Sequence, residues 1–223
     1  MKKNKLLIRF GIICAVLLSM YAVLRISGGL QFYQTPTSGN SPGIEPNSYI
    51  FVSNWVSYER FDFVCYEAED PFIGHSTFTH RLCGIAGDTV QIINGDLFVN
   101  SENVDKTLNV KHNYVVPQYS SFKIRKLDGV EYLGRTIDYI DSVILAIPLN
   151  DIPANFQARQ IIDDPHFKVH EQFPSEWTMD NFGPMVLDEG EIFLLGDNRN
   201  NSLDSRSNGL SSESDIVGVV LNK

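Results

Sequence analysis

Hydrophobic and polar positions divide the chain into one continuous apolar stretch near the N-terminus and many short apolar runs after it. Between Leu6 and Ile26 the sequence LLIRFGIICAVLLSMYAVLRI is apolar except for Arg9 and Arg25. About 20 such residues in a helix match a bilayer core about 30 Å thick, and arginines near the ends can reach the lipid–water interface. The stretch therefore predicts a transmembrane helix, with a cleaved signal peptide as the alternative.

The flanks of this stretch favour a retained anchor with a defined orientation. The segment RISGG, residues 25–29, matches a small-x-small cleavage site poorly. Basic residues cluster before the span, so we expect the N-terminus in the cytoplasm and the body in the periplasm or outside the cell. The sequence thus predicts a single-pass protein of the inner (plasma) membrane, with the lipid bilayer as a partner. Residues 1–28 would form the cytoplasmic stub and anchor, and residues 29–223 the body.

After the anchor, the pattern is typical of β-strands. The runs rich in β-branched and aromatic residues are 49–55, 61–67, 78–85, 89–100 and 191–198. Asn94-Gly95 inside the fourth run favours a hairpin, because a type I′ turn needs positive φ at both central positions. Helical periodicity outside the anchor is weak, and residues 141–161 are the one plausible short helical region. The predicted class is mainly β.

Composition and charge narrow the range of possible functions. With 43% hydrophobic residues the chain has the composition of a folded protein. The net charge is −9, and the first 27 residues carry only basic charges, so the body is more acidic than the whole. A nucleic-acid partner is excluded, because phosphate binding needs a basic face.

Cysteine and histidine usage indicates neither a metal site nor a cofactor. Cys14 lies in the anchor, while Cys65 and Cys83 lie in strand-like runs. The latter two are interpreted as buried free thiols, with a disulfide between neighbouring strands left open. The histidines of the region 101–176, which are His112, His166 and His170, match no ligand spacing and are interpreted as surface or structural residues.

Three segments combine polar residues with candidate chemistry. They are TPTSGNSPGIEP (residues 35–46), THRLCGIAGD (79–88) and LLGDNRNNSLDSRSNG (194–209). His80 in the second segment is either a satisfied strand histidine or a general base. The third segment is either a polar loop held by an Asp204/Arg206 ion pair or part of a site.

The order of these segments resembles the type I signal peptidases, membrane-anchored serine endopeptidases that remove signal peptides from exported proteins. GDNRNNSLDSR (residues 196–206) is nearly identical to the family's G-D-N-R-x-N-S-x-D-S-R. WTMDNFGPMVLDEGEIFLLGDNR extends the match upstream, and HRLCGIAGDTV followed by NGDLFVN resembles a second family block. The resemblance covers the anchor and the blocks 34–100 and 177–223, and leaves about 101–176 as a variable insert.

The resemblance implies a signal-peptidase-like antiparallel β-sheet domain behind one transmembrane helix. It also implies signal peptides of exported preproteins as partners and a preference for Ala-x-Ala before the cut. We expect the protein to be a monomer. In the family a lysine takes the proton from a serine in P-S-x-S-M-x-P. Counting back three residues from Pro42 puts Gly39 at that serine's position, and His80 stands at the lysine position. Ala86 and Asn208 also depart from the family pattern.

The histidine suits a base, whereas the glycine cannot be a nucleophile. Imidazole has an ordinary pKa of about 6.5 and is mostly neutral near pH 7, while lysine at about 10.4 needs burial to lose its proton. The signal peptidases of the endoplasmic reticulum and archaea resemble this arrangement. Ser38 and Ser41 lie on either side of Gly39, and a one-residue shift at the glycine would bring Ser38 to the site.

The sequence therefore predicts a signal peptidase I-like serine endopeptidase. The candidate catalytic residues are Ser38 or Ser41 as nucleophile, His80 as base, Thr37 for the oxyanion, and Ser202 and Asp204 as assisting groups, with Asp204 or Asp197 orienting the imidazole. The alternative is an inactive family member that binds signal peptides or a partner peptidase through the same groove. A third reading is a structural membrane-surface protein with only the β scaffold.

Overall fold

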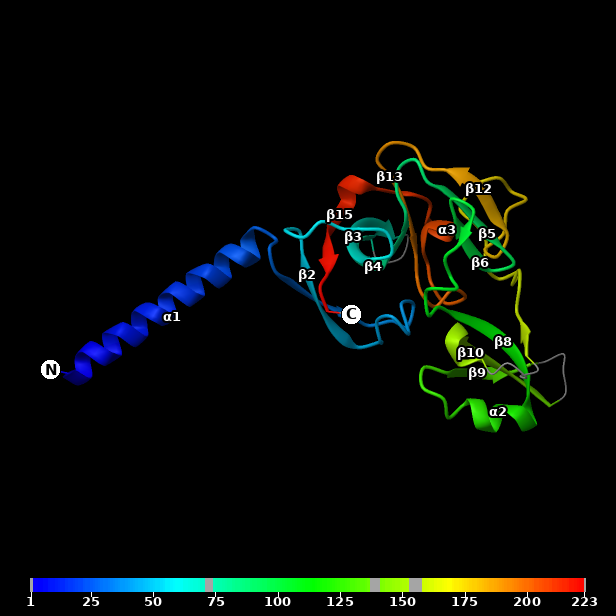
Figure 1. The fold of residues 1–223 in the computed structure, drawn as a ribbon, viewed down its shortest axis with the longest axis horizontal. Helices are drawn as coiled ribbons and strands as arrows, with labels where there is room; N and C mark the ends of the chain where they lie inside the picture. The colour runs from blue at the N-terminus through cyan, green and yellow to red at the C-terminus, as the bar shows by residue number, and fades with distance from the viewer. Residues whose placement is uncertain (1, 71–73, 137–140, 153–157, 223) are drawn as a thin grey trace.

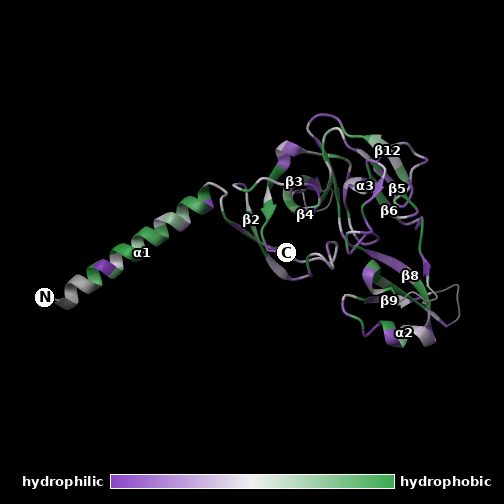
Figure 2. Cartoon of the chain, in the orientation of Figure 1, coloured by the Kyte–Doolittle hydropathy of each residue, from purple (hydrophilic) through white to green (hydrophobic). Residues whose placement is uncertain are grey.

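A long N-terminal helix projects from a body of β-strands in the computed structural model, which describes residues 2–70, 74–136, 141–152 and 158–222 (Figure 1). Within those residues, helix α1 (Lys2–Ile26) contains the one segment long and apolar enough to cross a membrane, Leu7–Ile26, with a mean hydropathy of 2.3. Figure 2 shows the apolar character along most of this helix. None of the segment is buried against the body, so protein packing does not explain its hydrophobicity.

The described residues of the body form three antiparallel sheets. The seven-stranded sheet has the order β1-β2-β15-β3-β4-β13-β14. Its strands are β1 (Gln31–Thr35), β2 (Ser48–Ser53), β15 (Ile216–Val220), β3 (Phe63–Asp70), β4 (Gly74–Gly84), β13 (Glu191–Leu195) and β14 (Ser211–Ser212). The second sheet, β12-β5-β6-β7, comprises β12 (Phe182–Val186), β5 (Thr89–Ile93), β6 (Asp96–Val99) and β7 (Glu102–Asn103).

The third sheet lies inside the segment that the sequence marks as an insert. Its order is β11-β8-β10-β9, from β11 (Arg159–Gln160), β8 (Lys111–Pro117), β10 (Ser142–Pro148) and β9 (Glu131–Arg135). It has its own buried cluster around Val116, Leu145 and Ile147. Short helices complete the described elements: α2 (Gln118–Ile124), α3 (Ser205–Asn208) and the 3₁₀ turns Leu149–Asp151 and Glu213–Asp215.

Strand β4 has one paired edge and one partly open edge. It pairs with the whole of β3, from Asp70 opposite Gly74 to Phe63 opposite Arg81. On its other side β13 pairs only from Arg81 onward. Residues 74–80 therefore have no second neighbour among the described strands, which leaves backbone groups of this segment available for an added strand.

The strand and hairpin predictions are confirmed. Each predicted run contains a strand, and the hairpin between β5 and β6 has φ of 50° at Asn94 and 89° at Gly95. Cys65 and Cys83 are free and buried, and burial raises their pKa values to about 11 and about 12. The buried thiols are therefore protonated at neutral pH.

The predicted helical region at 141–161 is wrong for most of the residues that the structure describes, since only Leu149–Asp151 forms a helical (3₁₀) turn. Ser142–Pro148 is strand β10, which pairs with β8 on one side and β9 on the other. The run is apolar and partly β-branched, and pairing on both edges outweighs its weak helical periodicity. Residues 153–157 of this prediction lie outside the described residues.

We predict that the core between β3, β4 and β13 carries much of the stability. Leu82 is fully buried and packs with Val64 and Leu194, so Leu82→Ala should lower the free energy of unfolding by about 2–5 kcal/mol. Leu133→Ala, at a residue 42% exposed, should cost less than about 1 kcal/mol. Urea unfolding of the full-length chain in detergent, followed by tryptophan fluorescence, measures both. Equal losses would contradict this assignment of the core.

Candidate active site

His80 lies near the end of β4 with both ring nitrogens in hydrogen bonds. Nδ1 is 2.8 Å from the hydroxyl of Tyr66, and Nε2 is 3.1 Å from Oγ of Ser202. Tyr66 is on β3, where its neighbour across the strands is Phe78, two residues before His80. This diagonal register puts the tyrosine and the histidine on the same face of the sheet. Strand pairing thus fixes one side of the imidazole, and the loop after β13 supplies the other.

Burial keeps the imidazole neutral. His80 is 7% exposed, and its pKa is lowered mainly by the loss of solvation. The charge of Arg206 lowers it further, whereas Asp204 and Asp197 raise it. Neither carboxylate hydrogen-bonds to the ring among the described contacts, so the expected orienting role passes to Tyr66. A neutral imidazole held at both nitrogens can accept a proton from a hydroxyl.

The loop after β13 is fixed by buried ion pairs. Arg206 donates to both carboxylate oxygens of Asp204 at 2.9 and 2.8 Å, which confirms the expected pair. Arg199 donates to both oxygens of Asp105 at 2.9 and 2.6 Å. Although burial favours the neutral acid, the charge and hydrogen bonds of Arg206 hold the pKa of Asp204 below its ordinary value.

Two glycines allow the segment before β2 to lie directly against this loop. A Cβ on Gly196 would come within 2.2 Å of Ser202 Oγ and 2.4 Å of the Gly39 carbonyl oxygen. That carbonyl accepts a hydrogen bond of 3.0 Å from the backbone N–H of Asn198. In the segment before β2, a Cβ on Gly39 would lie 3.8 Å from Ser202 Oγ. The nearest atom to that Cβ would be the Asn201 carbonyl oxygen at 3.3 Å, so a side chain at Gly39 would contact this loop.

The other hydroxyl candidates have different partners. Ser38 Oγ accepts a 2.8 Å hydrogen bond from the side-chain amide of Asn201. Ser41 is fully buried, accepts from Nζ of Lys111 at 2.8 Å and donates to Glu45 at 3.2 Å. Thr37 is exposed. Among the described hydrogen bonds neither serine meets His80, so the pairing of Ser38 or Ser41 with this base remains a prediction that the geometry does not support.

Three contributors carry no signal in the sequence patterns. Tyr66 could have been placed beside His80 only with the β3–β4 register. Lys111 is the first residue of strand β8 in the insert and is 4% exposed. Burial lowers the pKa of its amine, although the negative charges of Glu45 and Glu131 oppose this shift. Asn40 donates a 2.6 Å hydrogen bond to the Thr79 carbonyl on the open side of β4, and its Oδ1 has no partner among the described groups.

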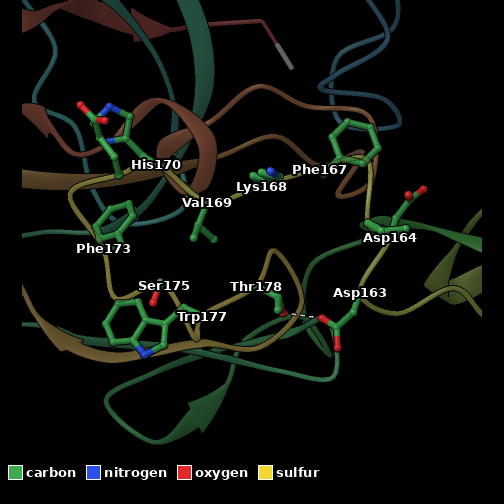
Figure 3. A pocket seen from close by; sticks show the side chains of 12 residues that line it. Asp163, Asp164, Phe167, Lys168, Val169, His170, Phe173, Ser175, Trp177 and Thr178 are labelled. Atoms are coloured by element: carbon green, nitrogen blue, oxygen red, sulfur yellow. Dashed lines mark hydrogen bonds between the residues drawn. The ribbon is translucent and has the colours of Figure 1, made fainter.

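A cavity of about 530 Å³ opens near this region and is lined by residues between Asp163 and Thr178 (Figure 3). The aromatic rings of Phe173 and Trp177 point into it from one side. A smaller hollow lined by Ser202 and Arg199 shares Asp164 and Phe167 with this cavity. Ser202 therefore lies on a small hollow next to the larger cavity.

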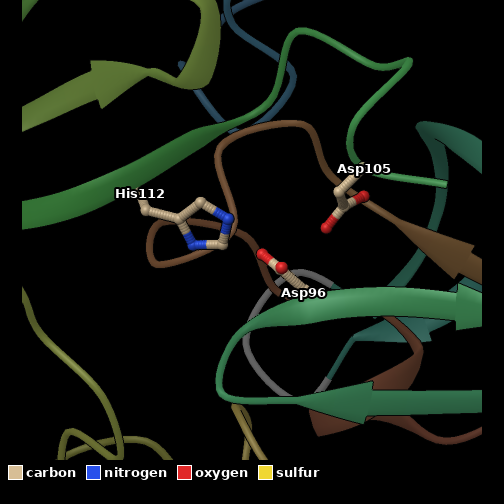
Figure 4. Close-up of side chains that lie close together, drawn as sticks. All are labelled: Asp96, Asp105 and His112. Atoms are coloured by element: carbon tan, nitrogen blue, oxygen red, sulfur yellow. The ribbon is translucent and has the colours of Figure 1, made fainter. Parts of the chain in front are cut away.

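One cluster has metal-ligating residue types but fits a cation poorly. Asp96, Asp105 and His112 place ligand atoms within 4.8 Å of one another (Figure 4). Both oxygens of Asp105 are already hydrogen-bonded to Arg199. Burial, followed by the charges of Arg199 and Arg206, lowers the pKa of His112 to about 3, so the ring already lies in a positive field. A divalent ion here would meet that repulsion.

Fold and site together define a mainly β protein in which a buried serine–histidine pair lies beside an open strand edge. The family model described as signal peptidase, peptidase S26, matches residues 7–222, and the chain belongs to this family. Signal peptidase I of Streptococcus pneumoniae is 27% identical over 177 residues, covering 79% of this chain and 73% of that protein. Signal peptidase I S of Bacillus subtilis is 25% identical, covering 80% and 67%.

A crystal structure of a signal peptidase I from Enterococcus faecalis is also similar, at 20% identity. The match covers 74% of this chain and 97% of that one, with a TM-score of 0.36. The family assignment does not depend on this overlap, because the sequence match spans nearly the whole chain.

We predict that the Asp204–Arg206 pair is needed to hold the loop. Arg206→Met should lower the free energy of unfolding by about 3–5 kcal/mol, because it leaves the Asp204 carboxylate buried without its counter-charge. Adding Asp204→Leu should restore part of this loss. Arg60→Met removes a pair whose arginine is 43% exposed and should cost about 1 kcal/mol or less. Urea unfolding compares the four proteins, and a double variant less stable than Arg206→Met would contradict the account.

Proposed function

We propose that this chain is a membrane-anchored endopeptidase that removes signal peptides from exported preproteins, with His80 as its general base. The observation that carries the proposal is the buried imidazole bonded to a serine hydroxyl at 3.1 Å. A buried imidazole needs a partner at each nitrogen, and a hydroxyl at Nε2 together with the neutral ring is also the arrangement that proton abstraction requires. Membership of the signal peptidase family supports the substrate class.

The substrate would bind as an added strand along β4. Residues 74–80 lack a second neighbouring strand among the described residues, and this open edge ends at His80. Extended peptides commonly bind such edges through main-chain hydrogen bonds, with pockets selecting alternate side chains. A signal peptide paired here would bring its peptide bonds to the imidazole. Asn40 donates to the Thr79 carbonyl. When a peptide binds, this hydrogen bond would either break, so that the carbonyl can accept from the peptide, or remain and mark the end of the paired segment.

The anchor would keep this site at the membrane surface. The segment Leu7–Ile26 is long and apolar enough to span, and Lys2, Lys3, Lys5 and Arg9 precede or begin it. Such a distribution favours a cytoplasmic N-terminus and a body on the outer side, where signal peptides emerge from the bilayer. The body would act there as a monomer, with residues 101–176 as an insert on the catalytic blocks.

One observation favours a second candidate function, binding of signal peptides or of a partner peptidase without cleavage. Gly39 stands where the family pattern has its serine, and Ser38 and Ser41 are bonded elsewhere. A protein that lost its nucleophile could keep the open edge of β4. The two functions differ in whether a bound precursor is cut.

The first test is cleavage of an exported precursor by the full-length chain in detergent, followed by mass spectrometry of the products. We expect a rate that rises with pH through an apparent pKa below about 6.5 and stays high toward pH 8, because the base must be neutral and burial lowers its pKa. His80→Ala should reduce kcat/KM at least about 10²-fold. His166→Ala, at an exposed histidine, is the matched control. Binding of the precursor with no product between pH 5 and 9 would favour the second function.

The second test concerns the residues before the cut. We expect peptides with alanine at the first and third positions before the scissile bond to be bound and cleaved best, because the family resemblance implies shallow pockets at an edge-paired peptide. Precursors with alanine, leucine or phenylalanine there would be compared by kcat/KM and by competition. Equal values for all three would contradict the proposed selectivity.

A further inference from the structure

A cavity lined by residues between Asp163 and Thr178 plays no part in the proposed proton transfer (Figure 3). Its volume of about 530 Å³ lies within the range of small-ligand sites and exceeds the volume of one amino-acid side chain. Its lining combines aromatic rings with carboxylates. Aromatic faces and carboxylates both attract cations, so the lining indicates a cationic ligand.

The aromatic wall of the cavity is fixed by the core. The rings of Phe173 and Trp177 stack with centroids 6.1 Å apart and planes inclined by 24°. Both rings contact Phe182 of β12, with centroid distances of 4.8 and 4.7 Å, and Phe182 is 1% exposed. Trp177 is itself half-buried at the cavity. A fixed indole is the strongest aromatic partner for a cation, and it binds at little cost in side-chain entropy.

The polar lining carries more negative than positive charge. Asp163, Asp164 and Glu171 line the cavity, against one ammonium group, that of Lys168. The described hydrogen bonds to the Asp163 carboxylate come from neutral donors, the hydroxyl of Thr178 and a side-chain amide. Among the described ion pairs, no lysine or arginine meets any of the three carboxylates. A cationic ligand would supply the missing positive charge.

Asp180 adds an unused acceptor beside the cavity. It is 1% exposed and lines the small hollow that shares Asp164 and Phe167 with the cavity. Its Oδ2 accepts from the backbone N–H of Asp163 at 2.7 Å, while its Oδ1 has no partner among the described groups. Buried carboxylate oxygens are normally hydrogen-bonded. The hollow has room for about one water molecule, which can link this oxygen to a cation in the cavity.

The cavity lies where a precursor paired with β4 would continue. The open edge of β4 ends at His80, because β13 pairs with the residues after it. His80 contacts Ser202, and Ser202 lines the same small hollow as Asp164. The backbone N–H of His170 on the cavity wall donates to the Arg206 carbonyl at 2.8 Å, which joins this wall to the loop after β13. Precursor residues beyond the cut would therefore leave the strand edge toward the cavity.

We propose that this cavity binds a basic side chain of the exported precursor, arginine or lysine, on the mature side of the cut. The inference rests on the substrate class proposed above and adds a second recognition site to the strand edge. Arginine should bind best, because its planar guanidinium can lie against Trp177 while donating to a carboxylate such as Asp164. Lysine supplies the charge without the planar group and should bind less tightly.

The test uses precursor peptides that differ in one residue of the mature side, with arginine, lysine, alanine or glutamate placed at each position in turn. The enzyme is the full-length chain in detergent. At one position, or at a few adjacent ones, we expect arginine to raise kcat/KM at least about 5-fold over alanine, and glutamate to lower it. The gain should lie mainly in KM, because the contact exists before and during the reaction, and it should shrink at high salt.

Charge reversal in the cavity separates a binding site from a wall that only supports the fold. Asp164→Arg should reverse the preference, so that glutamate is favoured over arginine at the same position. Trp177→Leu should weaken the arginine preference and leave the alanine peptide unaffected. Glu189→Gln, at an exposed acid outside the cavity lining, is the matched control and should keep the parent's preference. Thermal unfolding identifies any variant that fails to fold, and Asp164→Asn, which keeps the side-chain shape and should weaken the preference, then replaces Asp164→Arg.

Failure of this inference is distinguishable from failure of the proposed cleavage. Peptides with a methylated scissile amide resist cleavage, so their Kd reports binding alone. If the parent cleaves precursors without an arginine preference at any position, or if Asp164→Arg keeps that preference, the cavity is not a recognition site, while the endopeptidase function stands. If arginine strengthens binding in a way that depends on Asp164 and no product forms, the cavity site stands and the endopeptidase function is wrong. If no precursor binds, both proposals are wrong.

Discussion

Burial of arginine–aspartate pairs is the constraint on which the site depends. Arg199 and Arg206 are each 1% exposed, and each meets a carboxylate that is also buried. A charge placed inside a protein is tolerated only when its partner and its hydrogen bonds are in place. The conformation of the loop 196–206 pairs both guanidinium groups with carboxylates, although Nε of Arg199 has no partner among the described groups. That conformation sets the position of Ser202, and through it the environment of Nε2 on His80.

The same pairs set the electrostatics of the base. His80 loses solvent on all sides, and a buried imidazole with no compensation would simply remain inert and neutral. Here Asp204 lies close enough to favour the charged form, while Arg206 balances that carboxylate. The ring thus stays neutral at rest, yet has a buried negative charge nearby when it takes up a proton. The stability of the loop and the proposed proton transfer would therefore depend on the same ionic contacts.

Gly39, Gly196 and the insert (residues 101–176) explain how this chain can depart from the family's sequence pattern while keeping the fold. Gly196 has no room for a side chain, since its neighbours are Ser202 and the Gly39 carbonyl. Gly39 sits against Ser202 without crowding it. Lys111 connects the insert to this region, through Nζ on Ser41 and through backbone hydrogen bonds to Asp197 and Arg199. Ser41 thereby becomes part of the contact between sheet and insert.

The sequence by itself predicted strands β2, β3, β4, β5, β6 and β13, the Asn94-Gly95 hairpin and the apolar helix, and it offered the ion pair of Asp204 with Arg206 as one of two readings of its loop, because each follows from local pattern or from residues two positions apart. The blocks that match the family, and His80 at the family's lysine position, could also be recognised from the sequence. Only the tertiary structure decided which serine meets that histidine, since Ser202 is 122 residues away and the contact depends on the loop being folded. The partnership with Tyr66 needed the β3–β4 register, and the strand at Ser142–Pro148 needed its two neighbours. Long-range pairing and burial settle such choices, and neither can be read from the order of residues alone.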